Sequence, residues 1–256
     1  DYLAEITMSI MARARAKDPE KGYAIDFVSS VLKLNLRQIA DQKIKILSNA
    51  GGVNPEACAK AIRELVAELK LDLKVAVVLG DDLMQIKDDF VDIKEMYSKV
   101  DFPQEDKIAS INAYLGAFPI AQALKDGADI VITGRSVDSA VTLAACIYSF
   151  DWNENDYNKL ASGSLAGHII ECGTQSTGGN FTDWELASKD LHQIGYPIVD
   201  IKDNGEFDCS KSKDSTGLVS FGTVAEQMLY EIGDPQSYIL PDVICDFSQV
   251  KINEIE

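Results

Sequence analysis

Short apolar runs that alternate with segments of helical periodicity constrain the fold of this chain more than any other feature. Short runs that contain β-branched residues lie at 44–47, 75–79, 108–111 and 129–132. Between them, apolar residues recur at the three- and four-residue spacing of one helix face. Strands that alternate with helices favour right-handed crossovers and parallel pairing. We therefore expect an α/β fold with an open, mainly parallel sheet flanked by helices.

The expected helices have recognisable ends. Asn54 and Pro55 are typical of an N-cap and a first helical position, and Gly127 is expected to stop a later helix. The helices are predicted at 2–16, 25–36, 55–69, 120–124, 138–150 and 156–172. The last of them is rich in serine and glycine, which permits close packing against a neighbour.

The C-terminal part of the chain has a different pattern, with more turns and shorter apolar runs. We expect a core domain at 1–180 and a C-terminal α+β extension at 181–256, which can belong to the same domain. The extension is expected to contain a hairpin (198–201 and 206–209, with an Asn204-Gly205 turn), a helix that opens with the capping box Thr223–Glu226, and further strands within 238–250.

Charge and cysteine usage exclude several classes of protein. The chain has 41 acidic and 24 basic residues, a formal net charge of −17, which disfavours nucleic acid and anionic lipid as partners. No apolar run is long enough to span a bilayer, and no signal peptide is evident. The five cysteines (58, 146, 172, 209 and 245) form no CxxC pair. We expect no zinc ribbon or disulfide framework, and a reducing, cytoplasmic location.

Polar side chains follow the expected strands, at the sheet edge where open parallel sheets bind ligands. They are Asn49, Asn54, Asp81, Asp82, Asn112, Tyr114, Arg135 and Asp138. This concentration favours a small-molecule site. The alternative is that Asn54 and Asp138 only cap helices, and that the glycines among them only allow tight turns.

Two of these loops carry charge that could act on a ligand. Arg135 could bind a carboxylate or phosphate through its two-pronged guanidinium, or it could form a salt bridge to Asp138 or another acid. Asp81 and Asp82 could hold a divalent metal, although a pair of aspartates after a strand is common without one. We predict no cofactor, with a divalent metal as the alternative.

His168, Glu171 and Cys172 are spaced to share one face of the helix at 156–172. A Cys–His nucleophilic pair is disfavoured, because a thiolate at a helix C-terminus is opposed by the helix dipole. His168 is therefore expected to be either a general acid/base or a hydrogen-bonded structural histidine, with Glu171 orienting it.

The glycine-rich run 173–180 offers hydroxyls and closely spaced N–H groups that suit an anion. Its glycine spacing is similar to that of a P-loop, but Asn180 follows where a lysine is needed, and the chain contains no GxGxxG. A Walker-type nucleotide site and a dinucleotide fingerprint are therefore both unsupported.

Five stretches together resemble one known family. They are residues 1–5 (DYLAE), 48–55 (SNAGGVNP), 112–144, 163–181 (GSLAGHIIECGTQSTGGNF) and 222–243. In this order they closely resemble the acyclic terpene utilisation family, the AtuA-type proteins. Members of that family are longer at both ends and place a strand before the DYLAE motif, so we expect this chain to be truncated at both ends.

The resemblance implies a role in the catabolism of acyclic terpenes such as citronellol and geraniol, alongside enzymes that process branched acyl-CoA esters. The motif positions that it marks are Asn49, Gly51, Gly52, Asn54, Asn112, Tyr114, Gly134, Arg135, Asp138, His168, Glu171, Thr177, Gly178 and Gly179. We expect His168, Asp138 and Glu171 to be catalytic and the others to bind substrate.

The resulting hypothesis is a cytoplasmic, homo-oligomeric enzyme that acts on a branched acyl-CoA or related carboxylate. Arg135 and the turn 177–179 would hold the anion, while His168 or Asp138 moves a proton in a lyase or hydratase-type step. One alternative is a non-catalytic binding or assembly protein of the same pathway. Another is a divalent-metal hydrolase that uses Asp81, Asp82 and His168.

Overall fold

Contacts divide the chain into two compact units. The computed structural model describes residues 1–187 and 189–255. The first unit, here called the sheet unit, comprises Tyr2–Leu115 and Gln122–Ser136. The second, called the C-terminal unit, comprises Asp1, Gly116–Ala121 and Val137–Glu256. These are packing units, and the domain division expected near residue 180 stays a prediction.

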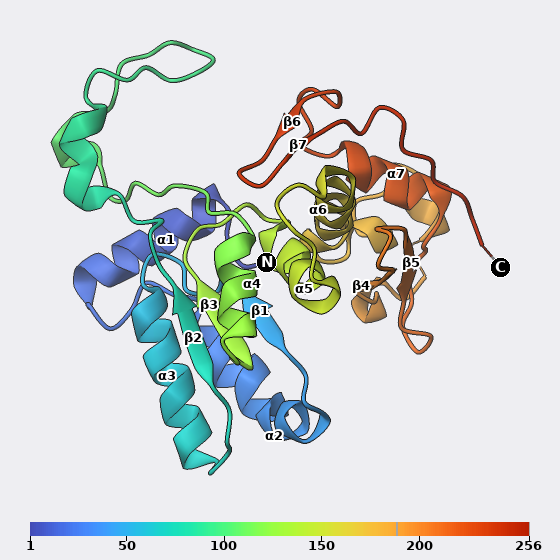
Figure 1. The fold of residues 1–256 in the computed structure, drawn as a ribbon, viewed down its shortest axis with the longest axis horizontal. Coiled ribbons are helices and arrows are strands. Elements are labelled where there is room, and N and C mark those ends of the chain that lie inside the picture. The colour runs from blue at the N-terminus through green and yellow to red at the C-terminus, as the bar shows by residue number, and fades with distance from the viewer. Residues whose placement is uncertain (188, 256) are drawn as a thin grey trace. The chain divides into compact units, whose positions relative to one another are not determined.

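The sheet unit is built on three parallel strands (Figure 1). They are β1 (Ile46–Ser48), β2 (Val75–Val78) and β3 (Ile130–Thr133), in the order β1-β3-β2. Both outer strands pair with β3, so Ile130 lies opposite Ile46 on one side and Val75 on the other. All four residues of β3 are buried, because helices cover a central parallel strand on both faces. The α/β class is confirmed, but the three-stranded sheet is small and is not the open sheet that was expected.

Helices and helical turns complete the sheet unit. They are α1 (Glu5–Lys17), the π-helical turn η1 (Phe27–Leu32) that continues into α2 (Lys33–Gln42), α3 (Pro55–Glu68), and the 3-10 turns η2 (Met84–Phe90) and η3 (Glu105–Lys107). The side chain of Asn54 caps α3 by accepting from the N–H of Ala57, and Pro55 is the first helical residue, as predicted. Leu36, Cys58 and Ile62 are completely buried in the core between these helices and the sheet.

The strand expected at 108–111 is wrong. The structure describes no strand there; η3 ends at Lys107, and the chain forms only an isolated antiparallel pairing between Asn112 and Asp82. None of residues 108–111 is buried. A run with only two β-branched residues and an interrupting Ser110 does not provide enough apolar surface for a place in the sheet.

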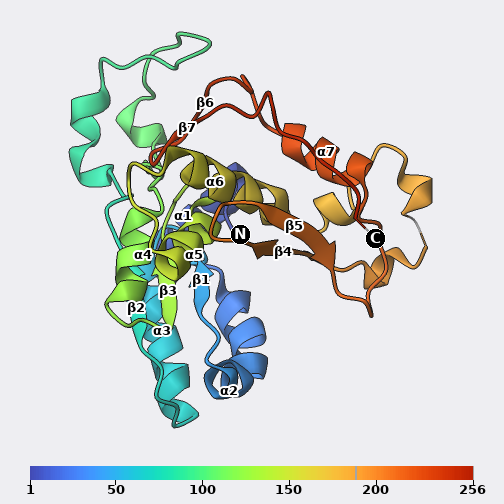
Figure 2. The same ribbon diagram turned by 45° about the vertical axis from the view of Figure 1, so that its right-hand side comes forward.

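The C-terminal unit combines helices with two hairpins (Figure 2). Its elements are α5 (Ala140–Phe150), α6 (Tyr157–Glu171), η4 (Gln175–Thr177), η5 (Trp184–Leu186), η6 (Leu191–Gln193), β4 (Pro197–Ile201), β5 (Phe207–Lys211), α7 (Phe221–Leu229), β6 (Tyr238–Ile239) and β7 (Ile244–Cys245). The antiparallel β4–β5 pair and the short β6–β7 pair confirm the predicted hairpin and the further strands. Helix α4 (Phe118–Lys125) contributes residues to both units.

Small residues bring α5 and α6 together. A Cβ at Gly167 would lie 2.8 Å from the backbone of Ser139, and one at Gly163 would lie 2.8 Å from Leu143. These distances are too short for any side chain, so the two glycines allow the close packing that the composition of α6 predicted.

Two helix starts differ from the prediction. The N-cap of α7 is Ser220, which exchanges hydrogen bonds with Thr223 in a capping box, so the expected box at Thr223–Glu226 is wrong. The cap position of α5 is Ser139, not Asp138. In both cases the helix begins within three residues of the predicted point, where sequence patterns are least decisive.

No helix in the described part of the chain is both long and apolar enough to cross a membrane.

Candidate functional site

A buried histidine–carboxylate pair forms on the last turn of α6. Because His168 and Glu171 are three residues apart on one helix, their side chains meet, and His168 Nδ1 lies 2.9 Å from Glu171 Oε1. Both side chains are almost inaccessible to solvent, with 3% and 6% of their surface exposed. The ring faces Tyr238, with 6.2 Å between the two ring centroids.

The environment of His168 stabilises its charged form. Burial alone would lower its pKa, but the hydrogen bond and the charge of Glu171 outweigh burial, and the pKa is raised above its ordinary value. Gln227 Nε2 donates to the backbone carbonyl of His168 over 2.8 Å and fixes this turn of the helix. His168 Nε2 is buried and contacts no hydrogen-bond partner among the described residues. The pair can therefore hold and exchange a proton.

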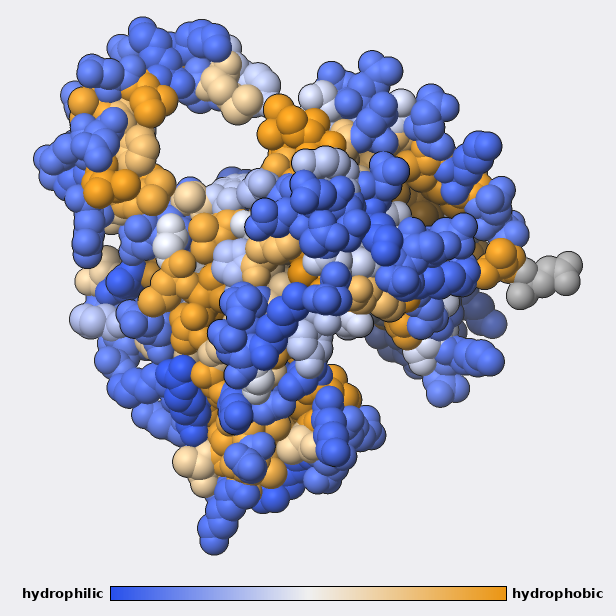
Figure 3. Space-filling model, in the orientation of Figure 1, coloured by the Kyte–Doolittle hydropathy of each residue, from blue (hydrophilic) through white to orange (hydrophobic). Residues whose placement is uncertain are grey.

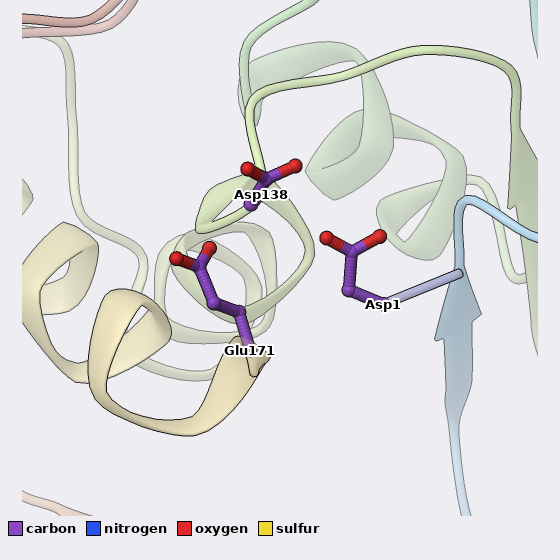
Figure 4. Close-up of side chains that lie close together, drawn as sticks. All are labelled: Asp1, Asp138 and Glu171. Carbon is purple, nitrogen blue, oxygen red and sulfur yellow. The ribbon is translucent and has the colours of Figure 1, made fainter. Parts of the chain in front are cut away.

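Two aspartates bring further carboxylates to Glu171. Asp138 precedes α5, and each of Asp1, Asp138 and Glu171 offers an oxygen within 4.8 Å of the other two. Figure 4 shows these three side chains converging from different segments. Carboxylates this close repel one another, and a shared proton or a bound cation would reduce the repulsion. The group can thus serve as a proton carrier or as an oxygen-rich cation site.

Neighbouring titratable groups are held in their neutral forms. Burial, followed by the negative charges of Glu171 and Asp138, raises the pKa of Tyr238 to about 12. Burial, followed by the charge of Glu171, raises the pKa of Cys172 to about 11. Cys172 is thus a thiol at neutral pH, which agrees with the expectation that it is no nucleophile.

Asp1, Gln227 and Tyr238 were missed as site residues by the sequence analysis. All three lie within the family-like stretches, yet they are far from His168 along the chain and show no spacing relationship to it. Only tertiary packing brings them to α6.

Arg135 is buried in the sheet unit. Its Nη1 donates to the carbonyl of Leu3 over 3.0 Å, and its guanidinium carbon lies 4.1 Å from the centroid of the Tyr114 ring. This stacked arrangement, in which the arginine is buried and the tyrosine is exposed, is one that cation–π attraction favours. The structure therefore brings together two predicted binding residues, Arg135 and Tyr114. These contacts are between parts of the chain and stabilise its fold.

Asp81 joins the ends of the strands. Its Oδ2 accepts the backbone N–H of Arg135 over 2.7 Å and the side-chain amide of Asn112 over 2.8 Å. A Cβ at Gly134 would lie 2.3 Å from this carboxylate, so only glycine fits there. Asp82 turns away, and its carboxylate lies 3.3 Å from Arg15 Nη1. The two aspartates thus bond in different directions, an arrangement that does not gather them around one metal.

The loop after β1 is likewise held by its own contacts. Asn49 accepts the N–H of Tyr2 over 2.8 Å, and the Asn54 amide donates to the carbonyls of Pro19 and Lys21. A Cβ at Gly51 would meet the Thr133 carbonyl at 2.3 Å, and Gly52 has a positive φ of 56°. These hydrogen bonds and close contacts account for the asparagines and glycines of the loop.

The glycine-rich turn after α6 uses its N–H groups internally. The N–H groups of Thr177 and Gly179 both donate to the carbonyl of Thr174, and that of Gly178 donates to the carbonyl of Gln175. The Thr177 hydroxyl lies 2.6 Å from the carbonyl oxygen of Gly195. An anion would therefore have to compete with these bonds, and binding of an anion here stays a prediction.

The sequence of the chain also matches a known family. Residues 1–256 of the chain match the family model described as acyclic terpene utilisation family protein AtuA. No curated protein and no solved structure gives a significant match.

Proposed function

Because the chain belongs to the acyclic terpene utilisation family, we propose that it is a catabolic enzyme that transfers protons on a branched acyl-CoA or a related carboxylate intermediate. The reaction class is a lyase or hydratase step. The observation that carries this proposal is the buried His168–Glu171 pair, with the carboxylate of Asp138 beside Glu171. A buried acid/base pair with a second carboxyl group nearby suits a reaction that removes one proton and returns another.

Each group has a distinct part in this step. Glu171 holds His168 in one orientation and raises the pKa of the imidazole, which can accept or release a proton. In an elimination of water, one group takes the proton from the carbon beside the acyl carbonyl, and another protonates the departing hydroxyl. We assign the removal of the proton from carbon to His168 and the protonation of the departing hydroxyl to Asp138.

The charge of the cluster favours one kind of substrate. Three carboxyl groups within 4.8 Å of one another repel a free carboxylate. The acyl carbonyl of a thioester is uncharged and carries no such penalty. A CoA thioester is therefore the preferred substrate, and the phosphates of its CoA portion must bind away from this cluster.

Deuterium exchange tests proton transfer without requiring net turnover. The protein is incubated in D₂O with branched β-hydroxyacyl-CoA and α,β-unsaturated acyl-CoA thioesters, and mass spectrometry follows deuterium at the carbon beside the carbonyl. We expect exchange in the wild type, loss of exchange in His168→Asn, and unchanged exchange in His192→Asn, which alters the other, exposed histidine. Exchange that survives in a folded His168→Asn variant would refute the proposal, and no exchange or turnover with any acyl-CoA would favour a binding protein.

A second candidate is a cation-dependent reaction at Asp1, Asp138 and Glu171. Carboxylate oxygens are the ligands that Mg²⁺ and Mn²⁺ prefer, and each of these three residues offers one within 4.8 Å of the other two. Calorimetric titration with Mn²⁺ should show binding that Asp138→Asn removes and that Asp82→Asn, a matched change of an exposed aspartate, leaves intact. No heat of binding in the wild type would exclude this candidate.

A further inference from the structure

The chain between β2 and α4 leaves the sheet unit as a long excursion. Residues 83–107, here called the arm, project from the end of β2 (teal in Figure 1). At its base, the N–H of Leu83 donates to the carbonyl of Ile111, and that of Ala113 donates to the carbonyl of Asp81. These bonds clamp the two ends of the excursion together, so that the arm leaves and returns at one point.

The arm has its own internal order. Lys94 pairs with Asp101 across it, both through the backbone and through an ion pair of 3.0 Å. The carboxylate of Glu95 accepts the N–H of Tyr97 over 2.9 Å in the turn at the tip. The rings of Phe90 and Phe102 lie 6.4 Å apart, and Lys87 pairs with Glu105 near the base. Local bonds therefore give the arm a defined shape.

This shape leaves the arm with apolar surface that no described residue covers. None of residues 82–116, a range that the structure describes in full, is buried. Six large apolar side chains of the arm are exposed by 47% to 82%: Ile86, Val91, Ile93, Met96, Tyr97 and Val100. Figure 3 shows apolar residues along the arm between charged ones. Ordering each residue costs on the order of 1–2 kcal/mol, and a segment without a buried side chain does not recover that cost alone.

We propose that the arm is a dimerisation element that packs against the arm of a second copy of this chain. Each of the six exposed side chains offers roughly 100 Å² of accessible surface, so together they provide on the order of 600 Å² on each copy. The aliphatic parts of the neighbouring charged side chains raise this area toward the ~800 Å² per partner of a stable interface. A two-fold axis brings the same patch of both copies together, so an apolar patch is its own complement.

The charges of the arm fit the same partner. The arm carries four lysines and seven acidic residues interleaved along 25 positions. In a two-fold pair, lysines of one arm can face acidic groups of the other at the rim, which gives the pair its register.

Sedimentation equilibrium over a range of protein concentrations tests the proposal. We expect a dimer in the wild type, and a dimer Kd raised at least about tenfold in Ile93→Asp and in Met96→Asp, because each places a charge in an apolar contact. The matched control is Leu34→Asp, which alters an even more exposed apolar residue on α2 and should leave the Kd unchanged. A wild type that is monomeric at all concentrations, or a dimer that both arm variants retain, would overturn the proposal.

A second measurement uses the wild type alone. Hydrogen exchange of the amides in 83–107 should slow as the protein concentration rises through the dimer Kd, while the amides of α2 should not change. Arm amides whose exchange is independent of concentration would also overturn the proposal, whatever the variants do.

Discussion

At the scale of single residues, the protonation of His168 depends on one neighbouring carboxylate. Burial opposes its charge and Glu171 supports it, and the second effect is larger. The same carboxylate also belongs to the group with Asp1 and Asp138. Glu171 therefore links the histidine to the carboxyl cluster, and changing it should alter both.

Replacing Glu171 with glutamine should lower the pKa of His168, because the hydrogen bond and negative charge that outweigh burial are lost. NMR titration of the imidazole measures this directly, with the exposed His192 ring as an internal reference. Glu231→Gln is the matched control, since the charge of Glu231 is the smallest of the influences on His168. A His168 pKa that stays the same in Glu171→Gln would show that Glu171 is not its charge partner.

The same shift has a consequence for stability. A histidine whose folded pKa lies above its unfolded value of 6.5 binds a proton more tightly in the folded state. Its contribution is complete below pH 6.5 and is lost as the pH rises through the folded pKa. Denaturant unfolding should therefore show the largest difference between the wild type and Glu171→Gln at mildly acidic pH. A difference that grows toward alkaline pH would contradict this sign.

Asp81 should prove structural, because its carboxylate accepts the buried N–H of Arg135 and the partly buried side-chain amide of Asn112. Asp81→Ala leaves the N–H of Arg135 and the amide of Asn112 without this acceptor, at a cost of about 1–3 kcal/mol in the free energy of unfolding. Asp82→Ala removes an exposed neighbour and should change it by no more than about 0.5 kcal/mol. Chemical denaturation of both variants decides the point; equal effects would rule out this role.

At the scale of elements, the proposed site depends on the fit between α5 and α6. Asp138 lies just before α5 and Glu171 ends α6, so the separation of these helices sets the distance between the two carboxyl groups. Gly167 packs against Ser139 at the start of α5, close to both groups.

Gly167→Ala should disturb this fit. The added methyl group would lie 2.8 Å from the backbone of Ser139, which neither helix can avoid without moving. We expect a loss of about 1–3 kcal/mol in the free energy of unfolding, typical of overpacking, together with reduced deuterium exchange on the acyl-CoA substrates. Gly233→Ala, at a position with no atom within 4 Å of the added Cβ, is the control. A Gly167→Ala variant as stable as this control would show that α5 and α6 have room to separate.

At the scale of the whole molecule, a formal charge of −17 places many like charges on one chain. Such an excess destabilises the compact state by self-repulsion, and salt screens it. The thermal midpoint at pH 7 should rise as NaCl increases from about 0.02 to about 0.2 M, a range over which the screening length falls to below ~10 Å. KCl should give the same rise, since screening depends on ionic strength. A midpoint that falls or stays constant would mean that salt-sensitive ion pairs outweigh the repulsion.

Periodicity was sufficient to predict the α/β class, the three strands of the sheet and the β4–β5 hairpin, because the apolar pattern of each element is local. The prediction of a strand at 108–111 was wrong. A segment takes a place in the sheet when its side chains are buried, and the side chains of 108–111 are not. The predicted position of the capping box of α7 was wrong by three residues. Both Ser220 and Thr223 can cap a helix, and only the path of the chain decides which one does.

The sequence by itself determined the His168–Glu171 pair, because two residues three apart on a helix meet wherever that helix is placed. It also determined the caps and tight turns around Asn54 and Gly52. Only the tertiary structure decided that Asp1 and Asp138 join Glu171, and that Arg135 stacks on Tyr114. These contacts join segments that are distant along the chain, and their formation depends on packing, which no local pattern encodes.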